Sequence, residues 1–184
     1  MVFKNHKNLE GQHAILSASR YAWVNYDEEK MIQTYYSLQQ AKRGTELHEY
    51  AAMAIRLGQK CPKSNKTICR YINDGISYRM TPEQVLYYSE NAYGTADTIS
   101  FREDLLRIHD LKTGVTPAKM TQLEIYAAFF CLEYHIKPKD IDMELRIYQN
   151  DEVVIHIPQA DDIVERMDKI IEFDRLIQRL KTEE

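Results

Sequence analysis

The sequence predicts an α/β fold in which helices flank a β-sheet. Three observations support this prediction. Apolar residues recur at helical spacing before residue 57, apolar and polar residues alternate between residues 84 and 112, and helical spacing returns near the end of the chain. With 184 residues, 44% of them hydrophobic, the chain is long enough to bury one core. We therefore expect a single domain over residues 1–184, with a core from about residue 12 to residue 157.

Two helical regions are expected in the first third of the chain. Residues 17–40 begin with a serine that can cap a helix, and Asn25-Tyr26-Asp27 is a point at which this region can break. Residues 43–57 follow as a second helix, in which His48 lies beside the apolar stripe and can face the sheet. Gly58 is typical of the residue just after a helix end.

The middle of the chain indicates strands. Helical periodicity is lost around Ile72, and residues 81–84 indicate a turn or a single helical turn. Short turns then separate three alternating runs, so we expect strands at 84–90, 92–102 and 105–112.

A helix, two strands and a final helix are expected in the remainder. Residues 121–133 form the helix, which Thr121 or the residue before it can cap. Residues 142–148 and 152–157 form a hairpin. An amphipathic helix covers about residues 161–181, with Asp162-Ile163-Val164-Glu165 as a capping box.

Three charged residues are expected to converge on one side of this sheet. Asp110 and Lys112 are two positions apart on a predicted strand, so their side chains point the same way. If Asp97 lies on the neighbouring antiparallel strand, its carboxylate reaches the space above Asp110. Hard divalent cations bind such oxygens. His109 points to the opposite face, where we expect it to pack.

Four short motifs occur in order along the chain. They are Leu16-Ser17-Ala18-Ser19-Arg20, Gly44-Thr45-Glu46-Leu47-His48, the pair formed by Asp97 and Asp110-Leu111-Lys112, and Gln122-Leu123-Glu124-Ile125-Tyr126. Together they resemble the PD-(D/E)XK nuclease superfamily, in particular the RecB-like group that includes phage and prophage exonucleases and CRISPR-adaptation nucleases. The resemblance covers roughly residues 12–130 and implies a restriction-endonuclease-like core with a central mixed β-sheet.

The resemblance also implies a metal site. Asp97 and Asp110 would be carboxylate ligands of Mg²⁺ or Mn²⁺, the backbone carbonyl of Leu111 would be a further ligand, and His48 would complete the site. Imidazole suits Mn²⁺ better than Mg²⁺. Taken singly, each residue has an ordinary alternative: an aspartate at a strand end is often a cap, and a histidine on a helix flank is often a surface residue.

The same resemblance implies roles for three further side chains. Lys112 would orient or deprotonate the attacking water and offset phosphate charge. Gln122 and Tyr126 are one helical turn apart, so they share a face, which in this family looks back at the lysine. The alternatives are a solvated lysine, an ordinary helix-start glutamine and a core tyrosine.

The three cysteines do not fit the iron–sulfur cluster that many RecB-like nucleases hold, because that cluster needs four. No iron–sulfur cluster is therefore expected. Cys131 is expected to be buried. Cys61 and Cys69 could join histidines around zinc, but their number and spacing make this an improbable alternative.

The net charge of −4 argues against a nucleic-acid partner, whereas its distribution argues for one. Residues 56–79 carry six basic residues against one acidic residue, a balance of +5 that suits a phosphate backbone. The alternative is a solvated loop. The chain also has thirteen tyrosines, and several could stack on unpaired bases. They are Tyr35, Tyr36, Tyr71, Tyr78, Tyr87, Tyr88 and Tyr93.

These observations together favour a metal-dependent DNA nuclease, with exonuclease activity in phage-type recombination or repair as the expected role. DNA ends, single- or double-stranded, are the expected partner, along with a homo-oligomer or a recombination-complex partner. Residues 1–7 lack the apolar segment of a secretion signal and no stretch predicts a membrane span, so we expect a cytoplasmic protein of phage or prophage origin in a bacterial host. The alternatives are a non-catalytic module that binds nucleic-acid ends or proteins, and a structure-specific endonuclease.

Overall fold

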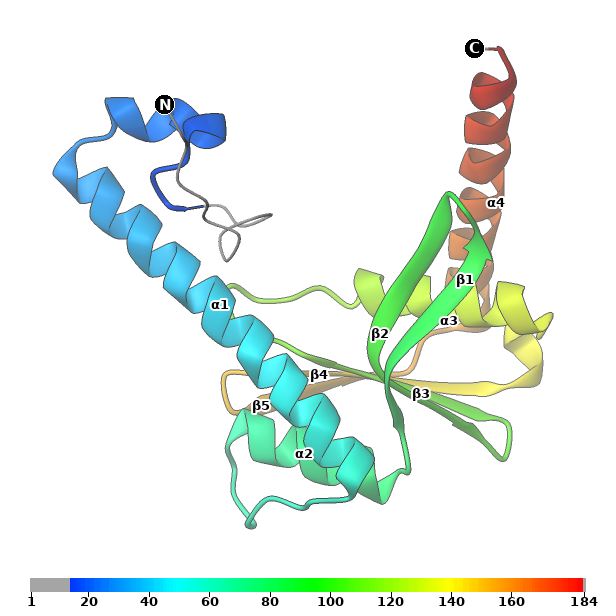
Figure 1. Ribbon diagram of the computed structural model, residues 1–184. Helices are drawn as coiled ribbons and strands as arrows, with labels where there is room; N and C mark the ends of the chain where they lie inside the picture. Colours follow the sequence, from blue (N-terminus) through cyan, green and yellow to red (C-terminus); the bar gives the residue numbers. More distant parts are fainter. Residues whose placement is uncertain (1–13, 184) are drawn as a thin grey trace, which may run out of the picture. The chain divides into compact units, whose positions relative to one another are not determined.

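The computed structural model describes residues 14–183 (Figure 1). The predicted start of the core at residue 12 and the N-terminal segment 1–7 lie outside the described residues. The described part falls into two units, residues 14–43 and residues 44–183. Among the described helices, none is long and apolar enough to cross a membrane.

Two helices make up most of the first unit. A 3₁₀-helix, η2, covers Ala18–Asn25, and the helix α1 covers Glu28–Leu57 and continues into the second unit. The predicted break near Asn25 is therefore confirmed. The expected serine cap is wrong: Ser17 makes no capping hydrogen bond, whereas the Asp27 carboxylate accepts one from the Lys30 N–H at 2.7 Å.

The second unit is built on a five-stranded mixed sheet. Its strands are β1 (Thr81–Ser89), β2 (Ala92–Arg102), β3 (Leu105–Leu111), β4 (Asp142–Gln149) and β5 (Glu152–His156). They lie in the order β1-β2-β3-β4-β5, and only the β3–β4 pair is parallel. The predicted α/β fold with a mixed sheet flanked by helices is confirmed at this level.

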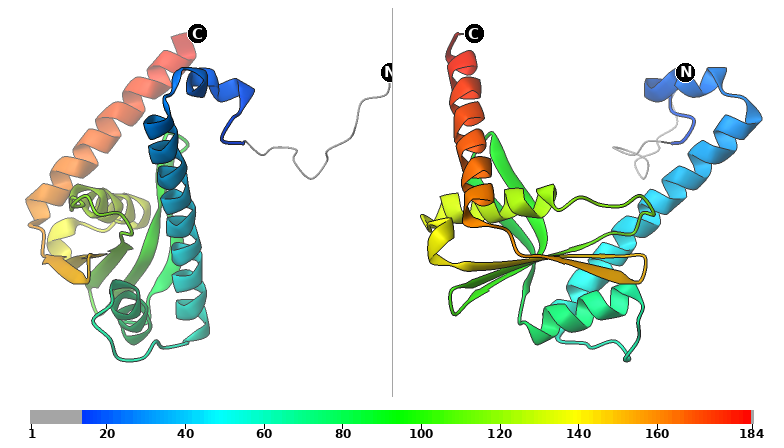
Figure 2. Two further views of the ribbon diagram at one scale, coloured as in Figure 1. Left: turned by 90° about the vertical axis from the view of Figure 1, so that its left-hand side faces the viewer. Right: turned by 180° about the vertical axis from the view of Figure 1, so that it is seen from behind.

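Helices cover both faces of the sheet (Figure 2). The helix α3 (Thr121–Tyr134) connects the two parallel strands and packs with α4 (Ala160–Glu183) on one face, where the core contains Leu106, Ile108 and Leu145. The helix α2 (Thr67–Ser77) and the last turns of α1 pack on the other face. A parallel pair of strands needs a crossover connection. The helix α3 supplies it between β3, which carries Asp110, and β4.

Three predictions about local structure are wrong. The predicted boundary between helices near residue 40 does not exist, because α1 runs through Gly44 to Leu57 and ends only at Gly58, with φ +65°. The segment around Ile72, for which no helix was predicted, forms the helix α2, and Ile72 is fully buried in it. Residues 81–84 are the start of β1 and not a turn.

The predicted helix caps in the second half are also wrong. Thr121 is the first residue of α3, and Met120 before it makes no side-chain capping bond. In α4 the capping box does not form; the Asp162 carboxylate instead accepts a hydrogen bond from the backbone N–H of Gln159, at 3.1 Å, just before the helix begins. Cys131 is buried as predicted, at 1% exposure.

Candidate metal and catalytic site

Asp97 lies where β2 and β3 separate. The ladder between these strands ends at the pair Thr98 and His109. One residue further on, the Asp97 side chain accepts a hydrogen bond from the backbone N–H of Leu111, with Oδ2 at 2.9 Å. The Asp97 carboxylate thus takes the place of the backbone acceptor that a continued β2–β3 ladder would offer to Leu111. This hydrogen bond fixes the carboxylate beside the end of β3, which carries Asp110 and is followed by Lys112.

His48 reaches this carboxylate from α1. Its Nδ1 lies 3.4 Å from Asp97 Oδ2, and both side chains are partly buried, at 30% and 18% exposure. The hydrogen bond with Asp97 raises the pKa of His48 above its ordinary value, although burial acts in the opposite direction. The prediction that His48 faces the sheet is confirmed.

Glu83 is a third member of the group, and the sequence analysis missed it. The register pairs Pro82 with Thr98 and Gln84 with Ala96, so Glu83 stands opposite Asp97. Ligand atoms of His48, Glu83 and Asp97 all lie within 4.8 Å of one another, and no other group of this kind occurs in residues 14–183. Burial and the nearby Asp97 charge raise the pKa of Glu83.

Asp110 is the most deeply buried acid near this group, with 2% exposure. Burial, followed by the charge of Asp97, raises its pKa, and the Lys112 ammonium opposes this shift. Lys112 Nζ donates a hydrogen bond to Asp110 Oδ1 at 3.1 Å and lies 3.0 Å from Oδ2. The buried Oδ2 itself accepts no hydrogen bond from the described residues.

A hydrogen-bonded chain continues from Lys112 to α3. Lys112 Nζ donates to Gln122 Oε1 at 2.8 Å, and Gln122 Nε2 donates to Tyr126 OH at 3.2 Å. Two predictions are thereby confirmed: Asp110 and Lys112 point the same way, and the shared face of Gln122 and Tyr126 looks at the lysine.

Two glycines allow the surrounding elements to approach closely. A Cβ on Gly94 would lie 2.9 Å from Tyr126 Cε1, and a Cβ on Gly44 would lie 2.8 Å from Thr113 Oγ1. Both distances are shorter than the usual separation of non-bonded atoms. Because both positions lack a side chain, α1 can lie against Thr113 and α3 can lie against β2.

The remaining predicted site residue is Leu111. Its side chain is buried in the core between the sheet and α2, and its N–H binds Asp97. The role of its carbonyl as a ligand stays a prediction. His109 is fully buried on the opposite face, as predicted, and burial lowers its pKa to about 3. Its Nδ1 lies 3.2 Å from Tyr148 OH.

A cleft of 290 Å³ adjoins Lys112, and part of the predicted basic stretch lines it. Lys66 lies at its wall, but its Nζ is paired with Asp151 Oδ2 at 2.7 Å. One of the tyrosines proposed for base stacking, Tyr71, is a wrong candidate because it is 2% exposed. The Tyr78 ring lies within 5.0 Å of the guanidinium groups of Arg107 and Arg146, and its stacking role stays a prediction.

No protein-family model, no curated protein and no solved structure matches this chain. The interpretation of the site therefore rests on its own residues. Those residues are a partly buried histidine beside two acids, a buried acid with an oxygen that accepts no hydrogen bond, and a lysine held by that acid and by Gln122.

Proposed function

We propose that this chain is a Mg²⁺- or Mn²⁺-dependent nuclease of the RecB-like PD-(D/E)XK type, on a restriction-endonuclease-like core, which hydrolyses phosphodiester bonds in DNA. One observation carries the proposal. Asp110 on β3 and Lys112, just after the strand, lie on either side of Leu111 in the chain, and Asp97 on β2 accepts a hydrogen bond from the Leu111 N–H. Exonuclease action at DNA ends, in phage-type recombination or repair, is proposed by family resemblance alone.

The side chains at this site are suitable ligands for a divalent cation. His48, Glu83 and Asp97 bring one imidazole and two carboxylates to one spot, where burial and then the nearby Asp97 charge raise the pKa of Glu83. Asp110 Oδ2, which lies 3.0 Å from Lys112 Nζ but accepts no hydrogen bond from the described residues, offers a further carboxylate oxygen at the same strand end. When bound, a divalent cation supplies charge for the scissile phosphate and lowers the pKa of a water molecule.

The residues of the chain perform the remaining tasks. The Lys112 ammonium is held at one point by Asp110 and Gln122, so it is pre-positioned to orient a water molecule and to offset negative charge on the phosphate. Gln122 takes its own orientation from Tyr126. Lys112 therefore acts on the substrate, and Gln122 and Tyr126 act through Lys112.

Degradation of end-labelled linear DNA with Mn²⁺ or Mg²⁺ tests the proposal. The wild type should release nucleotides, and chelation with EDTA should stop the reaction. Asp110→Asn and Lys112→Ala should each lower the rate at least about a hundredfold, since each removes a group that acts on the reacting centre. Asp168→Asn, which changes an exposed acid on α4, is the matched control.

Two other functions would give different results. A structure-specific endonuclease would also cut covalently closed circular DNA. A module that only binds nucleic-acid ends or a protein partner would bind DNA without metal-dependent cleavage, and equal rates for wild type and Asp110→Asn would discard the site.

A further inference from the structure

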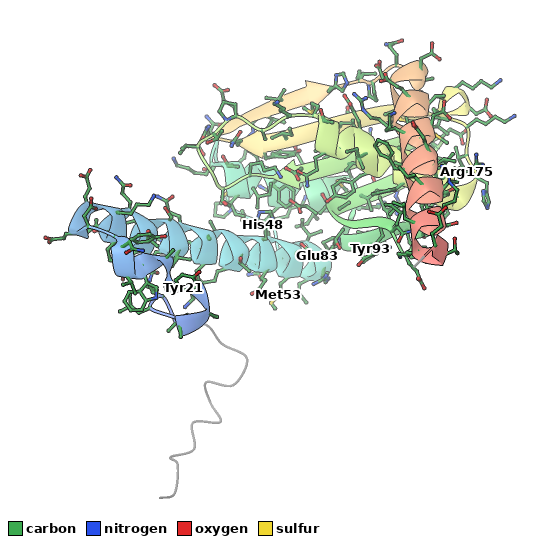
Figure 3. All side chains as sticks on the ribbon, turned by 90° about the horizontal axis from the view of Figure 1, so that it is seen from above. Tyr21, His48, Met53, Glu83, Tyr93 and Arg175 are labelled. Carbon is green, nitrogen blue, oxygen red and sulfur yellow. The ribbon has the colours of Figure 1, made fainter. Side chains whose placement is uncertain are left out.

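Within residues 44–183, one face of the β1–β2 ribbon next to the candidate site carries exposed side chains. On β1 the alternating residues Glu83, Val85 and Tyr87 are exposed, and on β2 Tyr93 and Thr95 are exposed. Glu83 and Tyr93 are both labelled in Figure 3. The opposite face of the ribbon packs against α3, because Gly94 meets the ring of Tyr126 and Leu86 lies in the same core.

The exposed face carries an aromatic pair. Tyr87 and Tyr93 are directly opposite each other in the ladder, their ring centroids are 6.3 Å apart, and their planes are inclined by 27° in a stacked arrangement. The side chains remain 46% and 61% exposed. The backbone N–H of Tyr87 also donates to Glu133 Oε2 on α3, at 2.8 Å, which anchors this part of the ribbon.

The aromatic pair and the acids belong to one ladder, at every second residue pair. The Tyr87–Tyr93 rung is followed by Val85–Thr95 and then by the position at which Glu83 faces Asp97. Asp97 is four positions after Tyr93, a span of roughly 13 Å along a strand. A short extended single strand covers this distance, and the small side chains of the middle rung leave its path open.

We propose that Tyr87 and Tyr93 form a stacking site for an unpaired base, so that the substrate strand lies along the ribbon as a single strand or a frayed end. This inference rests on the proposed nuclease function and adds its substrate class. In a duplex, neighbouring base pairs cover both faces of each base, so only an unpaired base offers a free face to the rings. Stacking on tyrosine is tolerant of sequence, since every base has a π-face.

The test compares binding of two cleavage-resistant phosphorothioate strands in Mn²⁺ by fluorescence anisotropy. One strand is a labelled oligothymidylate, and the other has the same backbone with abasic sites, so that charge is matched. The wild type should bind the strand with bases about fivefold to a hundredfold more tightly, the range typical of base stacking. Tyr87→Ala combined with Tyr93→Ala should lose this preference.

Two control variants separate stacking from general damage. The double variant with phenylalanine at positions 87 and 93 keeps both rings, so it should keep the preference for bases. Tyr134→Ala removes a tyrosine of similar exposure, 52%, at the end of α3, and it should also keep the preference. An alanine double variant that still prefers bases as the wild type does, or a wild type without preference, overturns the stacking site.

Hydrolysis of bis(p-nitrophenyl) phosphate in Mn²⁺ by the wild type distinguishes the two proposals, because this small diester has no base. A wild type that prefers bases but cleaves neither this diester nor DNA overturns the nuclease function and leaves the stacking site in place. A wild type that cleaves both but shows no preference for bases overturns the stacking site alone.

Discussion

The Lys112 ammonium donates a 2.8 Å hydrogen bond to Gln122 Oε1, and this contact ties the end of β3 to the first turn of α3. The candidate site therefore depends on how closely α3 approaches the sheet. That approach is set by Gly94, whose missing side chain leaves room for Tyr126.

Gly94→Ala should lower nuclease activity while the protein remains folded. The added Cβ would lie 2.9 Å from Tyr126 Cε1, so the ring must move and Gln122 loses its partner. A displacement of this size should reduce kcat by about tenfold to a hundredfold, while overpacking should cost about 1–3 kcal/mol of unfolding free energy. Gly114→Ala, where the Cβ meets nothing within 4 Å, is the control and should behave as wild type.

Gln122→Ala should lower kcat more than it raises KM. Its amide accepts a hydrogen bond from the Lys112 ammonium and donates one to Tyr126, so its loss frees the lysine without removing the charge. We expect a reduction of about tenfold in steady-state kinetics. A rise in KM with unchanged kcat would show that Gln122 contacts the substrate directly and does not position Lys112.

Glu83→Gln should have opposite effects on the metal-free and metal-bound protein. Without metal, it removes one of two facing acids, so the thermal midpoint should rise. With Mn²⁺, a ligand is missing, so the added stability from metal should shrink. Calorimetric titration and thermal scans with and without Mn²⁺ measure both effects. An unchanged affinity for Mn²⁺ would remove Glu83 from the site.

Asp151 should make the protein more stable as the pH rises through the acidic range. Hydrogen bonds from Lys66 and Thr67 lower its pKa to about 2 from 3.8, so the unfolded chain binds more protons between these values. The stabilisation is complete above about pH 4 and is lost as the pH falls toward 2. Asp151→Asn should remove this part of the pH dependence in urea unfolding.

Lys66→Met provides an independent check on the same contact. It removes the hydrogen bond from Lys66, which is the largest cause of the lowered pKa of Asp151, and leaves the Asp151 carboxylate in place. Its pH profile should therefore lie between those of the wild type and Asp151→Asn. A Lys66→Met profile that matches the wild type would mean that the helix N-terminus alone holds Asp151.

Much of the candidate site could be predicted because its spacings are local. Asp110 and Lys112 share a strand face through the period of two, and Gln122 and Tyr126 share a helix face through the period of about four. Glu83 could not be found in this way. Its position depends on the register between β1 and β2 and on a left-handed backbone, with φ 54°, within a strand.

The errors in the fold have similar physical causes. The helix α2 follows a basic loop and is short, but Ile68, Tyr71, Ile72 and Ile76 all pack on the sheet at helical spacing, a signal that the sequence did contain. The expected boundary between residues 40 and 43 does not exist, and Gly44 lies within α1, where its missing side chain permits close contact with Thr113. Tyr71 is part of the apolar stripe of α2, and it is covered by residues from distant parts of the chain.

The central place of β3 has a consequence for how the protein opens. Since β2 and β4 border β3 on either side, its amide hydrogens should exchange with solvent only when the sheet splits, in the slowest-exchanging class of the domain. Fraying of the terminal strand β5 would leave Asp110 and Lys112 undisturbed. The arrangement of Asp110 and Lys112 would then be kept when the sheet opens at β5, and it would be lost only when the whole domain unfolds.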